Sequence, residues 1–98
     1  MLNITKNLET NTLTISLAGR IDTNTAAQLE SELKEAPTVS ALIFDLEKLE
    51  YISSAGLRVF LSAQKKMAAQ GSMKLIHVQD AVMEILEVTG FIDILDIE

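Results

Sequence analysis

The chain has 98 residues, of which 48% are hydrophobic and 22% are charged, so we expect a single domain over residues 1–98 with a substantial apolar core. It has no cysteine and one histidine, which excludes disulfides, thiolate metal sites and His-rich metal sites. The formal net charge of -6 disfavours nucleic acid and anionic membrane surfaces as partners, because both are negatively charged.

Hydropathy gives no sign of insertion into a membrane. No apolar run approaches the ~20 residues that a spanning helix needs. The first residues, MLNITKNLE, lack the basic start and the apolar centre of a signal peptide. No coiled-coil heptad is present either. We therefore expect a cytoplasmic protein that is a monomer when free.

The N-terminal residues predict a β-hairpin. Apolar residues alternate with Thr and Ser over Thr12–Ala18, which is typical of a half-buried strand. Leu2 and Ile4 indicate a weaker strand before it, joined through a turn at ETN. We expect Gly19 to end the second strand.

An amphipathic helix is predicted next, over Thr23–Ala36, with its apolar residues on one stripe. It should end before Pro37, the only proline, because the residue before a proline avoids helical geometry. Its N-cap is either Thr25, which has capping-box spacing to Gln28, or Thr23.

The remaining residues predict two strands alternating with two helices. These are an inner strand over Ala41–Phe44 that is covered on both faces and closed by Asp45, a helix over Gly56–Ala69 stopped by Gly71, a strand over Met73–Val78, and a helix capped by Asp80 and ended by Gly90. The tail Phe91–Glu98 is either a helical turn or an edge strand. The order predicts an α/β protein with a four- to five-stranded mixed sheet, packed with three to four α-helices and joined by parallel crossovers.

Catalytic motifs are incomplete. Ser54 is followed by Gly56, but Ile52 stands where the nucleophile elbow of a serine hydrolase has its first glycine. The general base would have to be His77, whose apolar strand neighbours favour a structural role. The four glycines are not clustered, so phosphate-binding loops are absent. We expect no catalytic residue, no cofactor and no metal.

Polar side chains are expected to gather at one edge of the sheet. Asp22 and Asp45 each follow a predicted strand, and Ser53 and Ser54 come a short loop later. Because the carboxyl ends of parallel strands meet at the same edge, these residues should cluster there. The alternative is that the acids are only turn or cap residues.

Ser54 has two interpretations. It is positioned as the N-cap of the following helix, with its oxygen near the amides of Gly56 and Leu57. A helix N-terminus also favours negative charge, so a phosphate on Ser54 would be accepted without disrupting the fold. The sequence leaves open whether the hydroxyl is a cap or a phosphate acceptor.

Two segments carry a family resemblance. LIFDLEKLEYISSAGLRVFL resembles the central signature of the STAS domain, the fold of bacterial anti-sigma factor antagonists, and LAGRIDTNTAAQLE looks like its second signature. The resemblance implies that Ser54 is the phosphorylation site. Ser53, which stands where many members have Asp, is the second choice. The implied partner-binding residues are Asp22, Thr23, Asp45, Ser53, Ser54, Ala55, Gly56, Leu57 and Arg58.

The resemblance implies a partner-switching protein that is not itself an enzyme. The unphosphorylated form would bind an anti-sigma factor that is also a serine kinase, and phosphorylation would release it. A metal-dependent serine phosphatase would reset the switch, and ATP and Mg²⁺ would belong to these partners. The alternative is a STAS subunit with a structural role in a membrane transport ATPase complex, as in lipid trafficking.

Overall fold

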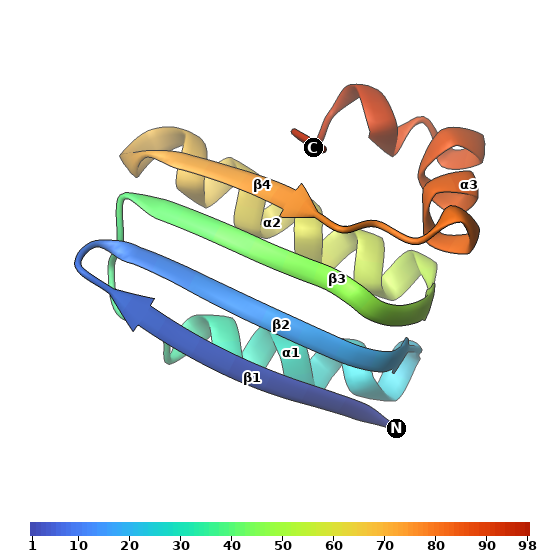
Figure 1. Ribbon diagram of the computed structural model, residues 1–98, viewed down its shortest axis with the longest axis horizontal. Coiled ribbons are helices and arrows are strands. Elements are labelled where there is room, and N and C mark those ends of the chain that lie inside the picture. Colours follow the sequence, from blue (N-terminus) through green and yellow to red (C-terminus); the bar gives the residue numbers. More distant parts are fainter.

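The computed structural model describes all residues from 1 to 98. Its elements are β1 (Leu2–Glu9), β2 (Thr12–Ile21), α1 (Thr23–Lys34), β3 (Ala41–Ile52), α2 (Ser54–Gln70), β4 (Ser72–Ile76), α3 (Asp80–Thr89) and a 3-10 turn at Phe91–Asp93. The strands form one sheet in the order β1-β2-β3-β4 (Figure 1). The β1–β2 pair is antiparallel and the other two pairs are parallel, which confirms the predicted mixed α/β fold.

The hairpin is longer than predicted. Gly19 was expected to end β2, but the strand continues through it to Ile21. Gly19 has φ +110, a conformation that glycine adopts readily, and a Cβ there would lie 2.2 Å from the carbonyl oxygen of Met1. β2 pairs with β1 on one side and with β3 on the other, and the pairing with β3 continues beyond Gly19 to Ile21.

Strand β3 contains the largest difference from the prediction. It was expected to span four residues and to end at Asp45, yet it has 12 residues and Asp45 lies inside it. The buried side chains are Leu42, Phe44, Leu46, Leu49 and Ile52. Their spacing changes from two to three because two register shifts interrupt the pairing with β2. Each irregularity takes up an extra residue of β3, which keeps the apolar side chains on one face of the sheet.

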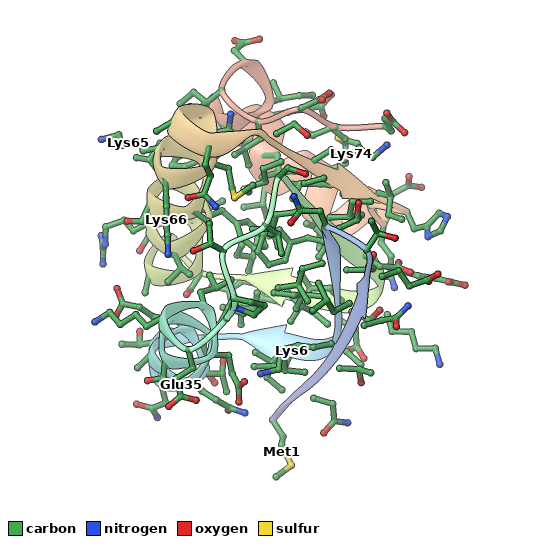
Figure 2. All side chains as sticks on the ribbon, turned by 90° about the vertical axis from the view of Figure 1, so that its left-hand side faces the viewer. Met1, Lys6, Glu35, Lys65, Lys66 and Lys74 are labelled. Carbon is green, nitrogen blue, oxygen red and sulfur yellow. The ribbon has the colours of Figure 1, made fainter.

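Helices cover only one face of the sheet. Figures 1 and 2 show α1 and α2 side by side in a layer behind the strands, with α3 beyond the end of β4. Twenty-three buried apolar residues form one core cluster, in which the rings of Phe44 and Phe60 lie 4.8 Å apart between centroids. The prediction that both faces of the inner strand are covered is wrong, since Ile43 and Asp45 on the other face are only half-buried.

The helix ends and the C-terminal tail mostly follow the predicted pattern. α1 ends before Pro37 and α2 ends at Gly71, as expected. The N-cap of α3 is Gln79 instead of Asp80, which is the first helical residue and interacts favourably with the helix dipole. The tail combines both predicted alternatives, because a 3-10 turn is followed by a parallel bridge between Leu75 and Ile97.

No helix in the structure combines the length and the apolar character that crossing a lipid bilayer requires.

A substitution of Phe60 tests the packing of the core. The side chain of Phe60 is fully buried against Phe44, so Phe60→Ala should lower the free energy of unfolding by about 3–5 kcal/mol. Val88, which is 82% exposed on α3, provides the control. Val88→Ala should change stability by no more than about 0.5 kcal/mol. Urea denaturation measures both values, and equal losses would contradict the described packing.

Candidate functional site

The first turn of α2 distinguishes the two serines. Ser53 is the N-cap, and its hydroxyl accepts a hydrogen bond from the amide of Gly56 at 3.2 Å. Ser54 is the first helical residue and is exposed. The prediction that Ser54 is the cap is therefore wrong. The cap falls one residue earlier because the amide of Ser53 donates to the carbonyl of Ile21 at 2.8 Å, which keeps the chain extended through Ser53.

Gly56 lets α2 approach the sheet closely. A Cβ at this position would lie 2.6 Å from Cγ2 of Ile21 and 2.8 Å from Cγ1 of Ile52. Leu57, the next residue, is buried in the core. The Gly-Leu pair thus sets how near the start of α2 sits to the ends of β2 and β3.

The start of α1 is capped by Asp22. Its carboxylate accepts from the Thr25 amide at 2.9 Å, and the Asp22 amide donates to the Thr25 hydroxyl at 2.8 Å. Thr23 and Thr25 were the predicted caps, and Thr25 turns out to be the other half of the capping box. The hydrogen bonds from the Thr25 amide and hydroxyl hold the pKa of Asp22 below its usual range.

Asp22 and the serines lie at the same edge of the sheet, as predicted. Ile21 pairs with Ile52, so Asp22 and Ser53 follow adjacent ends of β2 and β3. Of the predicted partner-binding residues in this region, Thr23, Ser54 and Arg58 are exposed, Asp22, Ser53 and Ala55 are half-buried, and Gly56 and Leu57 are buried. The sequence analysis missed Arg20, whose guanidinium lies 4.4 Å from the ring centroid of Tyr51. Both residues alternate with buried Ile21 and Ile52, which puts them on the open face.

Asp45 does not join this group. Asp45 pairs with Ser16 of β2, whereas the serines follow the pair that Ile21 forms with Ile52. Asp45 and the serines are therefore on the order of 15 Å apart along the strand. The carboxylate of Asp45 instead accepts from the Glu47 amide at 3.1 Å. The expected cluster of Asp22, Asp45 and the serines is therefore corrected to one without Asp45.

His77 contacts Asp45, with 3.0 Å between Nδ1 and Oδ1. It was expected within a strand and among apolar neighbours, but it follows β4 with φ +57 and is exposed. Asp45, Glu47 and His77 bring their ligand atoms within 4.8 Å of one another on the surface. The only imidazole thus contacts Asp45, which is remote from the serines, and it is not positioned as a base for Ser53 or Ser54.

Gly56 gives the first prediction for the site. Gly56→Val should lower the free energy of unfolding by about 2 kcal/mol, because the new side chain overlaps Ile21 and Ile52. Ala68→Val, at an exposed position of the same helix, controls for helix propensity and should lower stability by less than about 0.7 kcal/mol. Thermal melting compares the two. Equal effects would mean that close approach at Gly56 is unimportant.

Asp22 gives a prediction about pH. Its folded-state pKa is lowered, so its contribution to stability is present above the unfolded pKa of about 3.9 and is lost as the pH falls through the folded pKa. Asp22→Asn keeps a capping oxygen that does not titrate. Between about pH 6 and about pH 2, the free energy of unfolding should therefore fall more for the wild type than for this variant. Parallel urea titrations measure it, and identical slopes would contradict the assignment.

The sequence of this chain is similar to those of known proteins. The STAS domain model matches residues 3–98. A protein of Bordetella bronchiseptica called BtrV, whose name assigns it to the anti-sigma factor antagonists, is 38% identical over 81 residues, which cover 80% of this chain and 70% of that protein. The anti-sigma-B factor antagonist of Bacillus subtilis is 31% identical over 98% of this chain and 90% of its own length.

Solved structures show the same fold. The anti-sigma factor antagonist SpoIIAA in its unphosphorylated form superposes with a TM-score of 0.83 at 20% identity, over 98% of this chain and 88% of that one. The Bacillus cell fate determinant SpoIIAA in the phosphorylated form gives a TM-score of 0.74 at 19% identity, over 98% and 91% of the two chains. The named relatives give no support to the alternative of a transporter subunit. From the match over nearly its whole length, the chain belongs to the STAS domain family.

Proposed function

We propose that this chain is an anti-sigma factor antagonist whose partner binding is controlled by phosphorylation of Ser54. The observation that carries the proposal is an exposed hydroxyl at the first residue of α2, next to a serine that already caps the helix. The names of the relatives from Bordetella bronchiseptica and Bacillus subtilis support the antagonist role. The existence of SpoIIAA in phosphorylated and unphosphorylated forms supports the modification.

Ser54 is the better acceptor of the two serines. The Ser53 hydroxyl accepts a hydrogen bond from Gly56, and phosphorylating it would disturb the cap of α2. The Ser54 hydroxyl has no such bond and faces solvent, where a kinase reaches it. A phosphate on Ser54 would also stand beside the unpaired amides at the helix N-terminus, which favour negative charge.

The partner-binding surface that we propose consists of the starts of α1 and α2. Thr23, Ser54 and Arg58 offer exposed side chains, while Asp22, Ser53 and Ala55 are partly accessible. Gly56 and Leu57 act indirectly, by holding the first turn of α2 against the sheet. Asp45 lies outside this surface, because it is five residues of β2 away.

The partner that we propose for this surface is an anti-sigma factor that is also a serine kinase, with ATP and Mg²⁺ in the kinase and a metal-dependent phosphatase for the reverse step. The chain supplies only the acceptor hydroxyl and catalyses nothing. The phosphate adds about -1.5 to -2 charges near neutral pH. A buried interface would have to desolvate or pair that charge, so affinity falls.

Ser54→Ala should abolish phosphorylation and preserve binding to the unmodified partner, since the removed hydroxyl makes no hydrogen bond in the fold. The measurement combines incubation with the cognate kinase and ATP, phosphate mapping by mass spectrometry, and a binding assay. Ser53→Ala is the matched control. It should still be phosphorylated at Ser54, but lower stability by about 1 kcal/mol through loss of the cap. Wild-type phosphorylation of Ser54→Ala would refute the proposal and direct attention to Ser53.

A further inference from the structure

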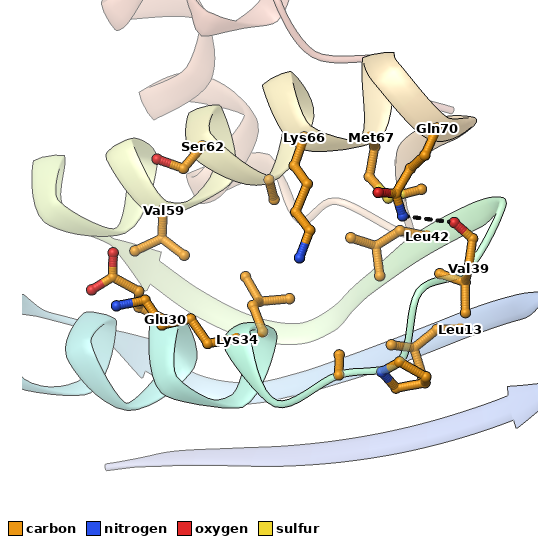
Figure 3. Close-up of a pocket in the computed structure, with 14 residues that line it drawn as sticks. Leu13, Glu30, Lys34, Val39, Leu42, Val59, Ser62, Lys66, Met67 and Gln70 are labelled. Atoms are coloured by element: carbon orange, nitrogen blue, oxygen red, sulfur yellow. Dashed lines mark hydrogen bonds between the residues drawn. The ribbon is translucent and has the colours of Figure 1, made fainter.

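A pocket opens between α1 and α2, along the part of α2 that runs from Val59 to Gln70 (Figure 3). Its volume is about 150 Å³. Lys66, one of its lining residues, lies twelve residues after Ser54, which is roughly 18 Å along the helix. Its apolar walls include Leu33, Val39, Leu42, Val59, Ala63 and Met67. This pocket belongs to neither the serines nor the proposed partner-binding surface.

Local structure holds the pocket open. α1 ends at Lys34, and Pro37 then leads the chain away from the helix toward β3. The connecting segment is fixed by a hydrogen bond from the Gln70 side chain to the carbonyl of Val39 at 2.9 Å (Figure 3). Ala63 contributes only a methyl group to the facing side of α2. The walls are therefore preformed and mostly apolar, with few polar groups, as is usual for sites that bind small molecules.

Charge at the pocket is opposite to the charge of the molecule. Lys34 and Lys66 both line it, whereas Glu30 is its only acid. The structure's ion pairs are Lys6–Glu32, Lys74–Glu98 and His77–Asp45, so neither pocket lysine belongs to one, although the end of Lys34 lies on the same side of the pocket as the Glu30 carboxylate (Figure 3). Figure 3 shows Lys66 extending from α2 toward α1 across the pocket. In a chain with a net charge of -6, the pocket is therefore locally positive, with two lysines against one glutamate beside an apolar cavity.

We propose that this pocket binds a small amphipathic carboxylate. The volume is similar to that of a cavity that accepts benzene, so we expect an apolar part of about six to eight carbons. Its chain packs against Val59, Ala63 and Met67, and its carboxylate lies beside the ammonium group of Lys66, which extends across the pocket (Figure 3). The lysine stems line the apolar region while their charged ends stay in water at the mouth.

Octanoate is the probe, added to the full ¹⁵N-labelled chain and followed by amide chemical shifts. We expect saturable shifts in the second half of α1, the segment that leads to β3, and α2 from Val59 onward. Octan-1-ol, which has the same chain without the charge, should bind more weakly, and octylammonium more weakly still. Absence of saturable shifts with octanoate, shifts located elsewhere, or equal affinity for the three ligands would overturn the proposal.

Variants separate the charge from the cavity. Lys66→Met keeps most of the stem and should weaken octanoate binding about two- to fivefold, with no effect on octan-1-ol. Lys65→Met is the matched control, because Lys65 is an exposed neighbour on α2 that does not line the pocket, and it should have no effect (Figure 2). Glu30→Gln should strengthen octanoate binding by removing the one opposing charge. Equal affinities for the Lys66 and Lys65 variants would overturn the charge assignment.

Ala63→Leu fills the cavity and should abolish binding of both octanoate and octan-1-ol. Thermal melting confirms that this variant is folded before the titration. If it does not fold, the Lys66, Lys65 and Glu30 variants, which change only exposed side chains, still decide the question. Octanoate binding to folded Ala63→Leu with wild-type affinity would place the ligand outside the cavity and refute the proposal.

Discussion

The pairing of Ile21 with Ile52 is the constraint on which the proposed switch depends. Both side chains are buried at the ends of neighbouring parallel strands, and the Ser53 amide extends the ladder by one bond to the Ile21 carbonyl. The chain turns into a helix directly after each strand, so α1 and α2 begin side by side. Gly56 then lets α2 contact both isoleucines without a Cβ between them. The positions of Asp22 and Ser54 follow from this packing.

The two irregularities of β3 make that pairing possible. Without them, side-chain alternation from Leu42, Phe44 and Leu46 would put Leu49 on the open face of the sheet. One shift brings Leu49 back to the helix-covered face, and the second does the same for Ile52. At the first of them the Asp45 carboxylate accepts a hydrogen bond from the Glu47 amide. Asp45 thus has a structural role in the strand, remote from the serines.

The sequence was sufficient to predict the order of elements, the hairpin, the parallel pairs and the edge shared by Asp22 and the serines, because each rests on local periodicity or topology. It was insufficient where tertiary hydrogen bonds decide. The prediction that Asp45 ends the strand did not allow for a β-bulge, after which buried side chains are three residues apart instead of two. The cap was assigned to Ser54 because the bond from Ser53 to Ile21 has no signal in the sequence. The pocket is equally invisible there, since its lining residues come from four separate elements and a loop.

Ser53 and Ser54 have different roles at the start of α2, and this difference determines how a phosphate acts. Because Ser53 alone caps α2, modification of Ser54 removes no hydrogen bond from the fold. The helix N-terminus contributes roughly 0.3–1 kcal/mol toward the new anion. Arg58, one turn later and exposed, adds roughly 0–1 kcal/mol, whereas Asp22 at the neighbouring helix start opposes it. These contributions are small and partly cancel, so the folded state tolerates the phosphate. The free energy of the switch therefore resides in the partner interface, where the same charge can no longer be solvated.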